Sequence, residues 1–232
     1  MKKIALVIMA VAALSGCAAT RQARSVDVSG FLIEYKQLLK PGGENQYVLL
    51  RYVKPNLDIK GYNKILLEPV TLWGDPKLRM TSNRQDLQTL ADSFYAMLKE
   101  KLSKKYTMVD EIEPNTLRLQ IALTHGEQSL VGLSFISKVV PQARVLNTLW
   151  SFASGKPAFA GGVTGEFKAT DAETGELLAA AVDRRIGGQK LFEKNVFSSW
   201  GDLQNALDYW GDLLIYRMCQ MRGDTDCVKP KA

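Results

Sequence analysis

The sequence predicts a single α+β domain with a mostly antiparallel sheet that two long amphipathic helices cover on one face. Strand-like runs of alternating, β-branched and aromatic residues recur between residues 47 and 186. Two longer runs, 82–102 and 199–222, place apolar residues at helical spacing. A turn signal at 171–175 separates two neighbouring strand-like runs and indicates that they pair antiparallel.

The size and composition of the chain suit one domain with an ordinary apolar core. Its 232 residues are 46% hydrophobic and 23% charged, which excludes wholesale disorder and a protein that spans a membrane several times. One histidine and three cysteines are too few ligands for most zinc or iron–sulfur sites. A net formal charge of +6 is too small to indicate nucleic-acid binding. We therefore expect neither a cofactor nor a nucleic-acid partner.

The start of the chain has the order of a secretory signal peptide. Lys2 and Lys3 precede the apolar run Ile4–Leu14, and small residues follow at 15–16. This run is shorter than the roughly 20 apolar residues that a transmembrane helix needs. We therefore expect residues 1–16 to be removed.

The end of this signal, Leu14-Ser15-Gly16-Cys17, resembles the lipobox of bacterial lipoproteins. The resemblance implies cleavage before Cys17 and attachment of three acyl chains, such as palmitate, through its thiol and its new amine. Three chains anchor a protein stably, since each buried methylene contributes about 0.8 kcal/mol. Ala18 stands in place of the aspartate that keeps such proteins in the inner membrane, which implies the periplasmic face of the outer membrane. The alternative is an ordinary signal peptide with a coincidental cysteine.

Once Cys17 is acylated, Cys219 and Cys227 remain as an even pair in an oxidising compartment. We predict a disulfide that ties the end of the last helix to the C-terminal tail. A loop this short gives about 2.5 kcal/mol of chain-entropy stabilisation. The alternative, metal binding or thiol redox chemistry, lacks a neighbouring histidine and a Cys-x-x-Cys motif.

Two parts follow the signal peptide: a lipidated tether, 17–30, and a single periplasmic domain, 31–232. The tether residues after Cys17 are small, polar or basic and show little periodicity. We expect them to let the domain extend away from the membrane.

The first half of the domain is predicted as a short helix, two strands and a long helix. The expected segments are Phe31–Leu39, Tyr47–Val53, Tyr62–Leu72 with Pro69 at an edge or strand end, and 82–102. Ser82-Asn83-Arg84-Gln85 has capping-box spacing and starts the long helix. The last turn of this helix holds several lysines, which the negative end of the helix dipole explains better than anion binding does.

The second half is predicted as three strands and a closing helix. The expected segments are 116–124, 163–170, 176–186 and 199–222. The first of them alternates apolar and polar residues, as a half-buried antiparallel strand does. The second and third form a hairpin, because Asp171 can accept hydrogen bonds from the turn amides and Gly175 can adopt a positive φ.

Four motifs are spread over nearly the whole mature chain: Ser29-Gly30-Phe31-Leu32 with Tyr35, Leu50-Arg51-Tyr52-Val53, Val145-Leu146-Asn147-Thr148, and the turn Asp171–Gly175 with Glu176 and Leu177. Together they resemble an uncharacterised family of proteobacterial, Gram-negative lipoproteins of unknown function. The resemblance implies a compartment and carries over no catalytic residues. The order of elements is also similar to that of periplasmic interaction domains of other envelope proteins.

The polar residues show no motif for catalysis. His125, the only histidine, is the base that a serine or cysteine nucleophile would need, but Gly-x-Ser-x-Gly and phosphate-loop motifs are absent. Asp110, Glu111 and Glu113 are the nearest to paired carboxylates, yet they flank a turn that ends at Pro114. We expect a non-catalytic interaction or assembly module of the cell envelope. The alternative is an envelope hydrolase that acts on peptidoglycan or lipid, such as a carboxylate-only glycosidase.

One segment, 128–165, contains no acidic side chain and many large apolar ones. Basic residues interleaved with tryptophan and phenylalanine suit contact with a membrane or a partner. The candidate contact residues are Phe135, Ile136, Val139, Leu149, Trp150 and Phe152. The alternative is that the same segment belongs to the core. Beyond the lipid anchor in the membrane, we expect another envelope protein or a second copy of the chain as the partner.

Overall fold

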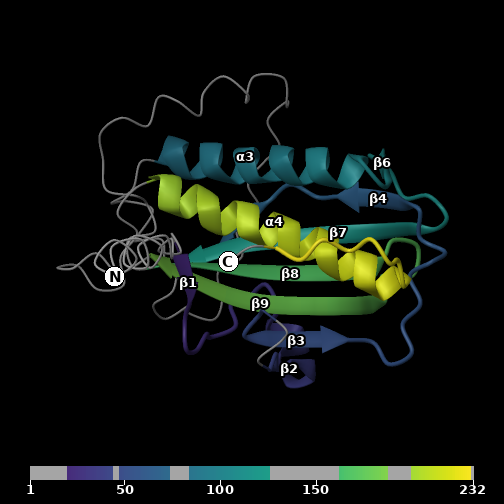
Figure 1. Cartoon of the computed structure of the whole chain (residues 1–232), viewed down its shortest axis with the longest axis horizontal. Helices are drawn as coiled ribbons and strands as arrows, with labels where there is room; N and C mark the ends of the chain where they lie inside the picture. The colour runs from purple at the N-terminus through teal and green to yellow at the C-terminus, as the bar shows by residue number, and fades with distance from the viewer. Residues whose placement is uncertain (1–19, 44–46, 74–83, 126–161, 188–199, 231–232) are drawn as a thin grey trace, which may run out of the picture.

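A mixed β-sheet with helices packed against it forms the body of the protein (Figure 1). The computed structural model describes residues 20–43, 47–73, 84–125, 162–187 and 200–230. The predicted α+β class is confirmed. Within these ranges the sheet has nine strands, which are β1 Thr20–Gln22, β2 Lys40–Pro41, β3 Leu50–Val53, β4 Lys64–Leu67, β5 Thr71–Trp73, β6 Thr107–Val109, β7 Thr116–His125, β8 Val163–Asp171 and β9 Leu177–Gly187.

The strand order along the sheet is β2-β3-β9-β8-β7-β4-β6, with β1 paired to β9 and β5 paired to β7. The long strands β7, β8 and β9 pair antiparallel, as predicted. By contrast, β4 runs parallel to both β6 and β7, and β5 runs parallel to β7. Helix α3, Arg84–Ser103, is the crossover that connects β5 to β6, and residues 110–115 then connect β6 to β7 on the other side of β4.

The β8–β9 hairpin has the turn chemistry that the sequence predicts. The Asp171 carboxylate accepts hydrogen bonds from the amides of Glu173 and Thr174 at 3.0 and 2.7 Å. These hydrogen bonds hold the pKa of Asp171 below its usual value, and the bond from the Thr174 amide has the largest effect. Gly175 has a φ of 73°, and its amide donates to the Asp171 carbonyl at 2.9 Å. A residue without Cβ is suited to that conformation.

The alternation predicted for 116–124 is also confirmed. Leu117, Leu119, Ile121 and Leu123 of β7 are all buried in the main apolar cluster. Because successive side chains of a strand point to opposite faces, these four lie on one face of the sheet.

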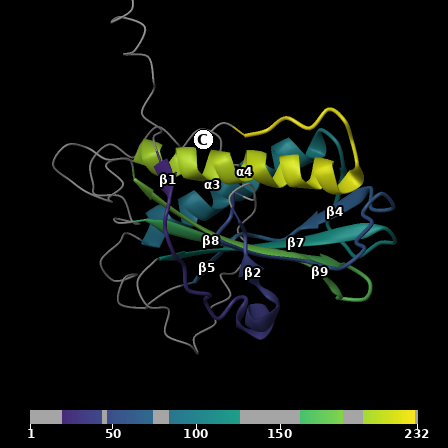
Figure 2. The ribbon, with the colours of Figure 1, turned by 60° about the horizontal axis from the view of Figure 1, so that its bottom comes forward.

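Helices α3 and α4, Trp200–Arg222, lie side by side (Figure 2) and share this cluster with the sheet. Phe94 and Leu98 from α3 and Leu203 and Trp210 from α4 belong to it, and each is at most 1% exposed. The ring of Trp210 meets that of Phe167 from β8 edge to face, with centroids 5.7 Å apart. Both helices are therefore fixed to the sheet through aromatic and leucine packing.

The predicted end of the last helix is confirmed. Gly223 has a φ of 75°, and the amide of Asp224 donates to the carbonyl of Cys219 at 3.2 Å. This is the pattern of a glycine-terminated helix whose last carbonyls are satisfied locally.

The segment predicted as a tether, 17–30, is attached to the domain from Thr20 onward. β1 pairs with the end of β9, and the side-chain amide of Gln22 donates a hydrogen bond to the Asp183 carboxylate at 2.6 Å. Further along, Val28 and Ser29 are buried, and the 3-10 helix η2, Ile33–Leu38, follows. The sequence did not indicate this attachment because it depends on partners about 160 residues away.

Residues 26–39 form a second, smaller apolar cluster with the sheet. Leu32 is fully buried in this cluster, beside Val182 and Ala180 of β9. Since Val182 and Asp183 are neighbours on a strand, this cluster and the Asp183 carboxylate lie on opposite faces of the sheet.

Candidate functional site

A cavity of about 460 Å³ lies between α4 and strands β3, β7, β8 and β9. This volume falls within the usual range of small-molecule sites, about 300 to 1,000 Å³. Ala179 and Ala181 of β9 line it and remain half-buried, because a methyl group is too short to fill the space between a sheet and a helix. Opposite them are apolar side chains from α4, which are Leu213, Leu214, Met218 and Met221.

Two guanidinium groups, those of Arg51 on β3 and Arg217 on α4, belong to the residues that line this cavity. Burial, followed by the positive charge of Arg51, lowers the pKa of Arg217. Arg217 donates to the Gln220 side chain at 2.8 Å, and its guanidinium lies 5.7 Å from the Tyr47 ring centroid. The Lys229 ammonium lies 4.8 Å from that same centroid. The cavity is therefore apolar inside and has cations close to it.

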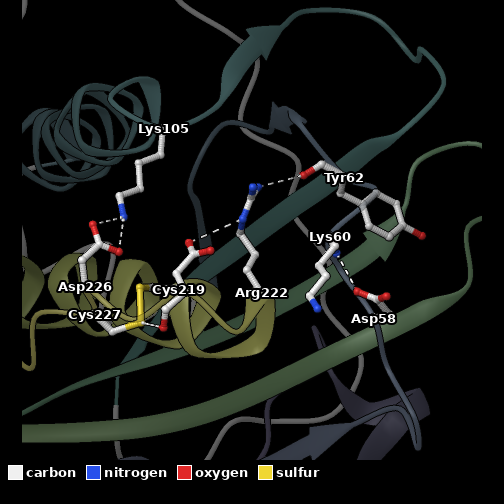
Figure 3. A network of polar contacts seen from close by, with 9 residues as sticks. Asp58, Lys60, Tyr62, Lys105, Cys219, Arg222, Asp226 and Cys227 are labelled. Carbon is white, nitrogen blue, oxygen red and sulfur yellow. Dashed lines mark hydrogen bonds and ion pairs between the residues drawn. A yellow bond between two sulfur atoms is a disulfide. The ribbon is translucent and has the colours of Figure 1, made fainter.

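A disulfide joins Cys219 in α4 to Cys227 in the tail (Figure 3), consistent with the predicted pair. The tail is also held by an ion pair from Lys105 to Asp226 at 3.3 Å. At the end of α4, Arg222 donates to the Tyr62 carbonyl at 3.4 Å. These contacts hold the tail against α4 and α3 and place Lys229 beside Tyr47.

Cys219, Asp224 and Asp226 lie close enough together to suggest metal ligands. However, the Cys219 sulfur is bonded to Cys227 and offers no thiolate. Asp224 faces Arg222 at 3.6 Å, and Asp226 faces Lys105. This cluster is explained by the disulfide and two ion pairs.

A buried polar cluster ties β1, β9 and α4 together. The Asp183 carboxylate, fully buried, accepts hydrogen bonds from Gln22 at 2.6 Å and from the Trp210 indole at 2.8 Å. Burial raises the pKa of Asp183 against the effect of these bonds. The neighbouring Arg185 lies 3.7 Å from the same carboxylate and stacks on Tyr209 at 3.5 Å. Each of these groups is engaged within the fold, which makes the cluster structural.

A second buried acid lies on the other face of the sheet. Glu166 of β8 is fully buried, and its Oε1 accepts a hydrogen bond from the Ser29 amide at 2.5 Å. Among the described residues, its Oε2 has no hydrogen-bond partner. Burial raises the pKa of Glu166, although the bonds from Ser29 act in the opposite direction. The hydrogen bond between Ser29 and Glu166 therefore attaches the segment before η2 to β8, near the centre of the sheet.

The residues predicted for membrane and partner contact lie outside the described ranges. They are Cys17, Phe135, Ile136, Val139, Leu149, Trp150 and Phe152. His125 is the last residue of β7, one position beyond the predicted strand 116–124. No helix within the described ranges is long and apolar enough to cross a bilayer.

The turn acids do not form a paired site. Asp110 and Glu111 are exposed, and Asp110 lies 4.0 Å from Lys99. Glu113 pairs instead with Lys64 at 2.6 Å. Asp110 and Glu113 therefore each meet a lysine, as expected for acids in a solvated turn.

The fold and the cavity define an α+β domain with a ligand-sized apolar site. The chain belongs to a family described as protein of unknown function (DUF3313), whose model matches residues 27–214. The uncharacterized lipoprotein YdcL of Escherichia coli strain K12 is 30% identical over 134 residues, or 58% of this chain and 60% of that protein. YdcL of E. coli O157:H7 matches equally, so the chain spans about 60% of the length of both relatives. The predicted resemblance to uncharacterised proteobacterial lipoproteins is confirmed.

Two solved structures of the PelC dodecamer from Paraburkholderia phytofirmans are also similar. One is a leucine-to-methionine variant and covers 67% of this chain and 87% of its own, and the other covers 71% and 91%. Both have 11% sequence identity and a TM-score of 0.33. A score this low supports no conclusion about this chain.

Proposed function

We propose that this protein is an outer-membrane lipoprotein whose domain faces the periplasm and acts by binding another molecule, without catalysis. The observation that carries the proposal is the cavity beneath α4. Its lining is mostly aliphatic, and its charged members, Arg51, Lys168 and Arg217, are all basic.

The lipid anchor is supported by the motif at the end of the signal peptide and by the relatives. Leu14-Ser15-Gly16-Cys17 matches a lipobox, and both YdcL proteins bear the name lipoprotein. Acylation of Cys17 would attach the domain to a bilayer without a membrane-spanning helix. Ala18 favours the outer membrane over the inner one.

The Cys219–Cys227 disulfide supports a periplasmic position for the domain. Disulfides persist in the oxidising periplasm and are rare in the reducing cytosol. The proposed lipid anchor and the disulfide therefore both support a position in the periplasm.

We propose that the domain also binds a protein partner, which is another envelope protein or a second copy of the chain. The proposed contact is the part of the acid-free segment 128–165 that precedes β8. Trp150→Ala and Phe152→Ala should lose a cross-linked partner during purification from envelopes while the unfolding midpoint stays unchanged. Unfolding of these variants would instead assign the segment to the core.

The anchor and its location can be tested in cells. Mass spectrometry should find the N-terminal peptide starting at an acylated Cys17, and density fractionation should find the protein in the outer membrane. Cys17→Ala should abolish acylation, and Ala18→Asp should move the protein toward the inner membrane. An unmodified Cys17 in the wild-type protein would contradict the proposal.

The absence of catalysis is tested with the purified protein and two substrates, peptidoglycan and phospholipid vesicles. We expect no turnover of either. Turnover that disappears on a single Asp→Ala or Glu→Ala change would identify an envelope hydrolase in place of a binding module.

A further inference from the structure

We propose that the cavity beneath α4 binds the hydrocarbon chain of an anionic amphiphile, with its charged head beside Arg51 and Arg217. This inference rests on the proposed binding function and names its ligand class. The shared chemistry is an acyl chain that ends in a negative group. Free fatty acids and lysophospholipids are the two sources of that chemistry.

The lining of the cavity suits a hydrocarbon chain. Leucine, isoleucine and methionine side chains come from α4, from β7 and from the loop after β3, with Leu57, Ile59 and Met218 as examples. Ala179 and Ala181 leave an open channel along β9, where larger side chains would fill it. An acyl chain gains affinity from such surfaces without any specific polar contact.

The charges of the lining suit an anionic head. Among the described residues that line the cavity there is no aspartate or glutamate, whereas Arg51 and Arg217 bring two positive charges. The charge of Arg51 contributes to the lowered pKa of Arg217, so the two cations are close enough to act on one anionic group. Guanidinium groups also bind carboxylates and phosphates through paired hydrogen bonds. Lys168 borders the cavity too, but its ammonium lies 4.8 Å from the Phe31 ring centroid, on the other face of the sheet.

The C-terminal tail adds a third cation, Lys229, on the side of Arg217. Cys227 fixes the tail to α4, and Lys229 lies over the Tyr47 ring that Arg217 also approaches. The disulfide therefore has a consequence for ligand binding, since it holds a positive charge near the cavity.

The direct test is calorimetric titration of the mature chain, residues 17–232 with Cys17→Ala, by saturated fatty acids of increasing length. Affinity should rise about fourfold per added methylene and reach a plateau when the cavity is full. The fatty alcohol of equal length should bind about tenfold more weakly, because it lacks the anion. A lysophosphatidylglycerol of equal chain length, compared with the fatty acid, shows which of the two headgroups is preferred.

Two variants locate the site. Ala181→Leu fills the channel and should abolish binding, whereas Ala96→Leu on α3, which does not line the cavity, should leave it unchanged. Arg217→Gln should remove the preference for the acid over the alcohol. Circular dichroism and the unfolding midpoint establish that each variant folds, and a variant that fails to fold is replaced by Ala179→Leu.

Several outcomes would overturn the inference. Affinity that does not depend on chain length, or that survives both Ala179→Leu and Ala181→Leu, excludes the cavity as the site. Equal binding of acid and alcohol excludes the anionic head. A change of oligomeric state in Ala181→Leu would make a second copy of the chain the occupant. Acylation of Cys17 and partner capture are measured independently of the cavity, so this inference can fail while those parts of the proposed function stand.

Discussion

Replacing Glu166 with glutamine should change how the stability of the protein depends on pH. The Glu166 carboxyl group is fully buried, with Oε1 bonded to the Ser29 amide and Oε2 unbonded among the described residues. Burial raises its pKa above the ordinary value of 4.5. The ionised form is therefore less favourable in the folded state than in the unfolded state.

The sign of the effect follows from proton binding. Between pH 4.5 and the raised pKa, folded Glu166 keeps a proton that the unfolded chain has lost. The free energy of unfolding therefore decreases as the pH rises through this window, by at most about 1.4 kcal/mol per pH unit for one group. Below the window both states are protonated, and the contribution of Glu166 to the pH dependence vanishes.

Urea unfolding at pH 5, 6, 7 and 8 measures this dependence. The wild-type protein should lose stability with rising pH more steeply than Glu166→Gln does. The variant should retain some slope, because burial also raises the pKa of Asp183. Glu111→Gln, at an exposed turn position, serves as the control and should match the wild type. Identical slopes for Glu166→Gln and the wild type would refute the reasoning and indicate that water reaches the carboxylate.

Three further changes test the packing and the covalent link. The double variant Cys219→Ser, Cys227→Ser should have a free energy of unfolding about 2.5 kcal/mol lower than the wild type. In the wild-type protein, peptide mapping without reductant should recover the two cysteines as a disulfide-linked pair. Trp210→Phe removes an indole N–H from the buried carboxylate of β9 and should cost about 1.5–3 kcal/mol in urea unfolding, so an unchanged midpoint contradicts that bond. Gly165→Ala should cost about 1–3 kcal/mol because its Cβ would lie 2.7 Å from an aromatic ring, whereas Gly61→Ala, with no atom within 4 Å, should change stability by less than about 0.5 kcal/mol.

The elements that the sequence predicts well are those whose determinants are local. The turn at Asp171–Gly175 and the end of α4 at Gly223 each depend on residues within five positions. The alternation along β7 likewise identifies its buried face without any partner. By contrast, the run 62–72 is predicted as one strand but forms β4 and β5, with Pro69 between them. Strand β6 is too short, at three residues, to show a period.

Features that depend on distant partners could not be predicted. β1 exists because Gln22 reaches Asp183, and the Glu166 contact exists because Ser29 lies across the sheet. The cavity is a property of the space between two layers, so no single strand pattern indicates it. The one signal in the sequence is the run Ala179–Ala181 within a predicted strand, where small side chains leave room above the sheet.

The attachment of β1 to β9 would limit the distance between the domain and a bilayer that holds an acylated Cys17. With Cys17 acylated as proposed, the three residue steps to Thr20 span at most about 10 Å. Thr20 pairs with Gly187, so acylation of Cys17 would keep this end of β9 close to the bilayer. Ala181 lies six residues further along the strand, roughly 20 Å from Gly187 at about 3.4 Å per residue. For a chain acylated at Cys17, the paired sheet would therefore limit how far the cavity can lie from the bilayer, and a long flexible linker would not.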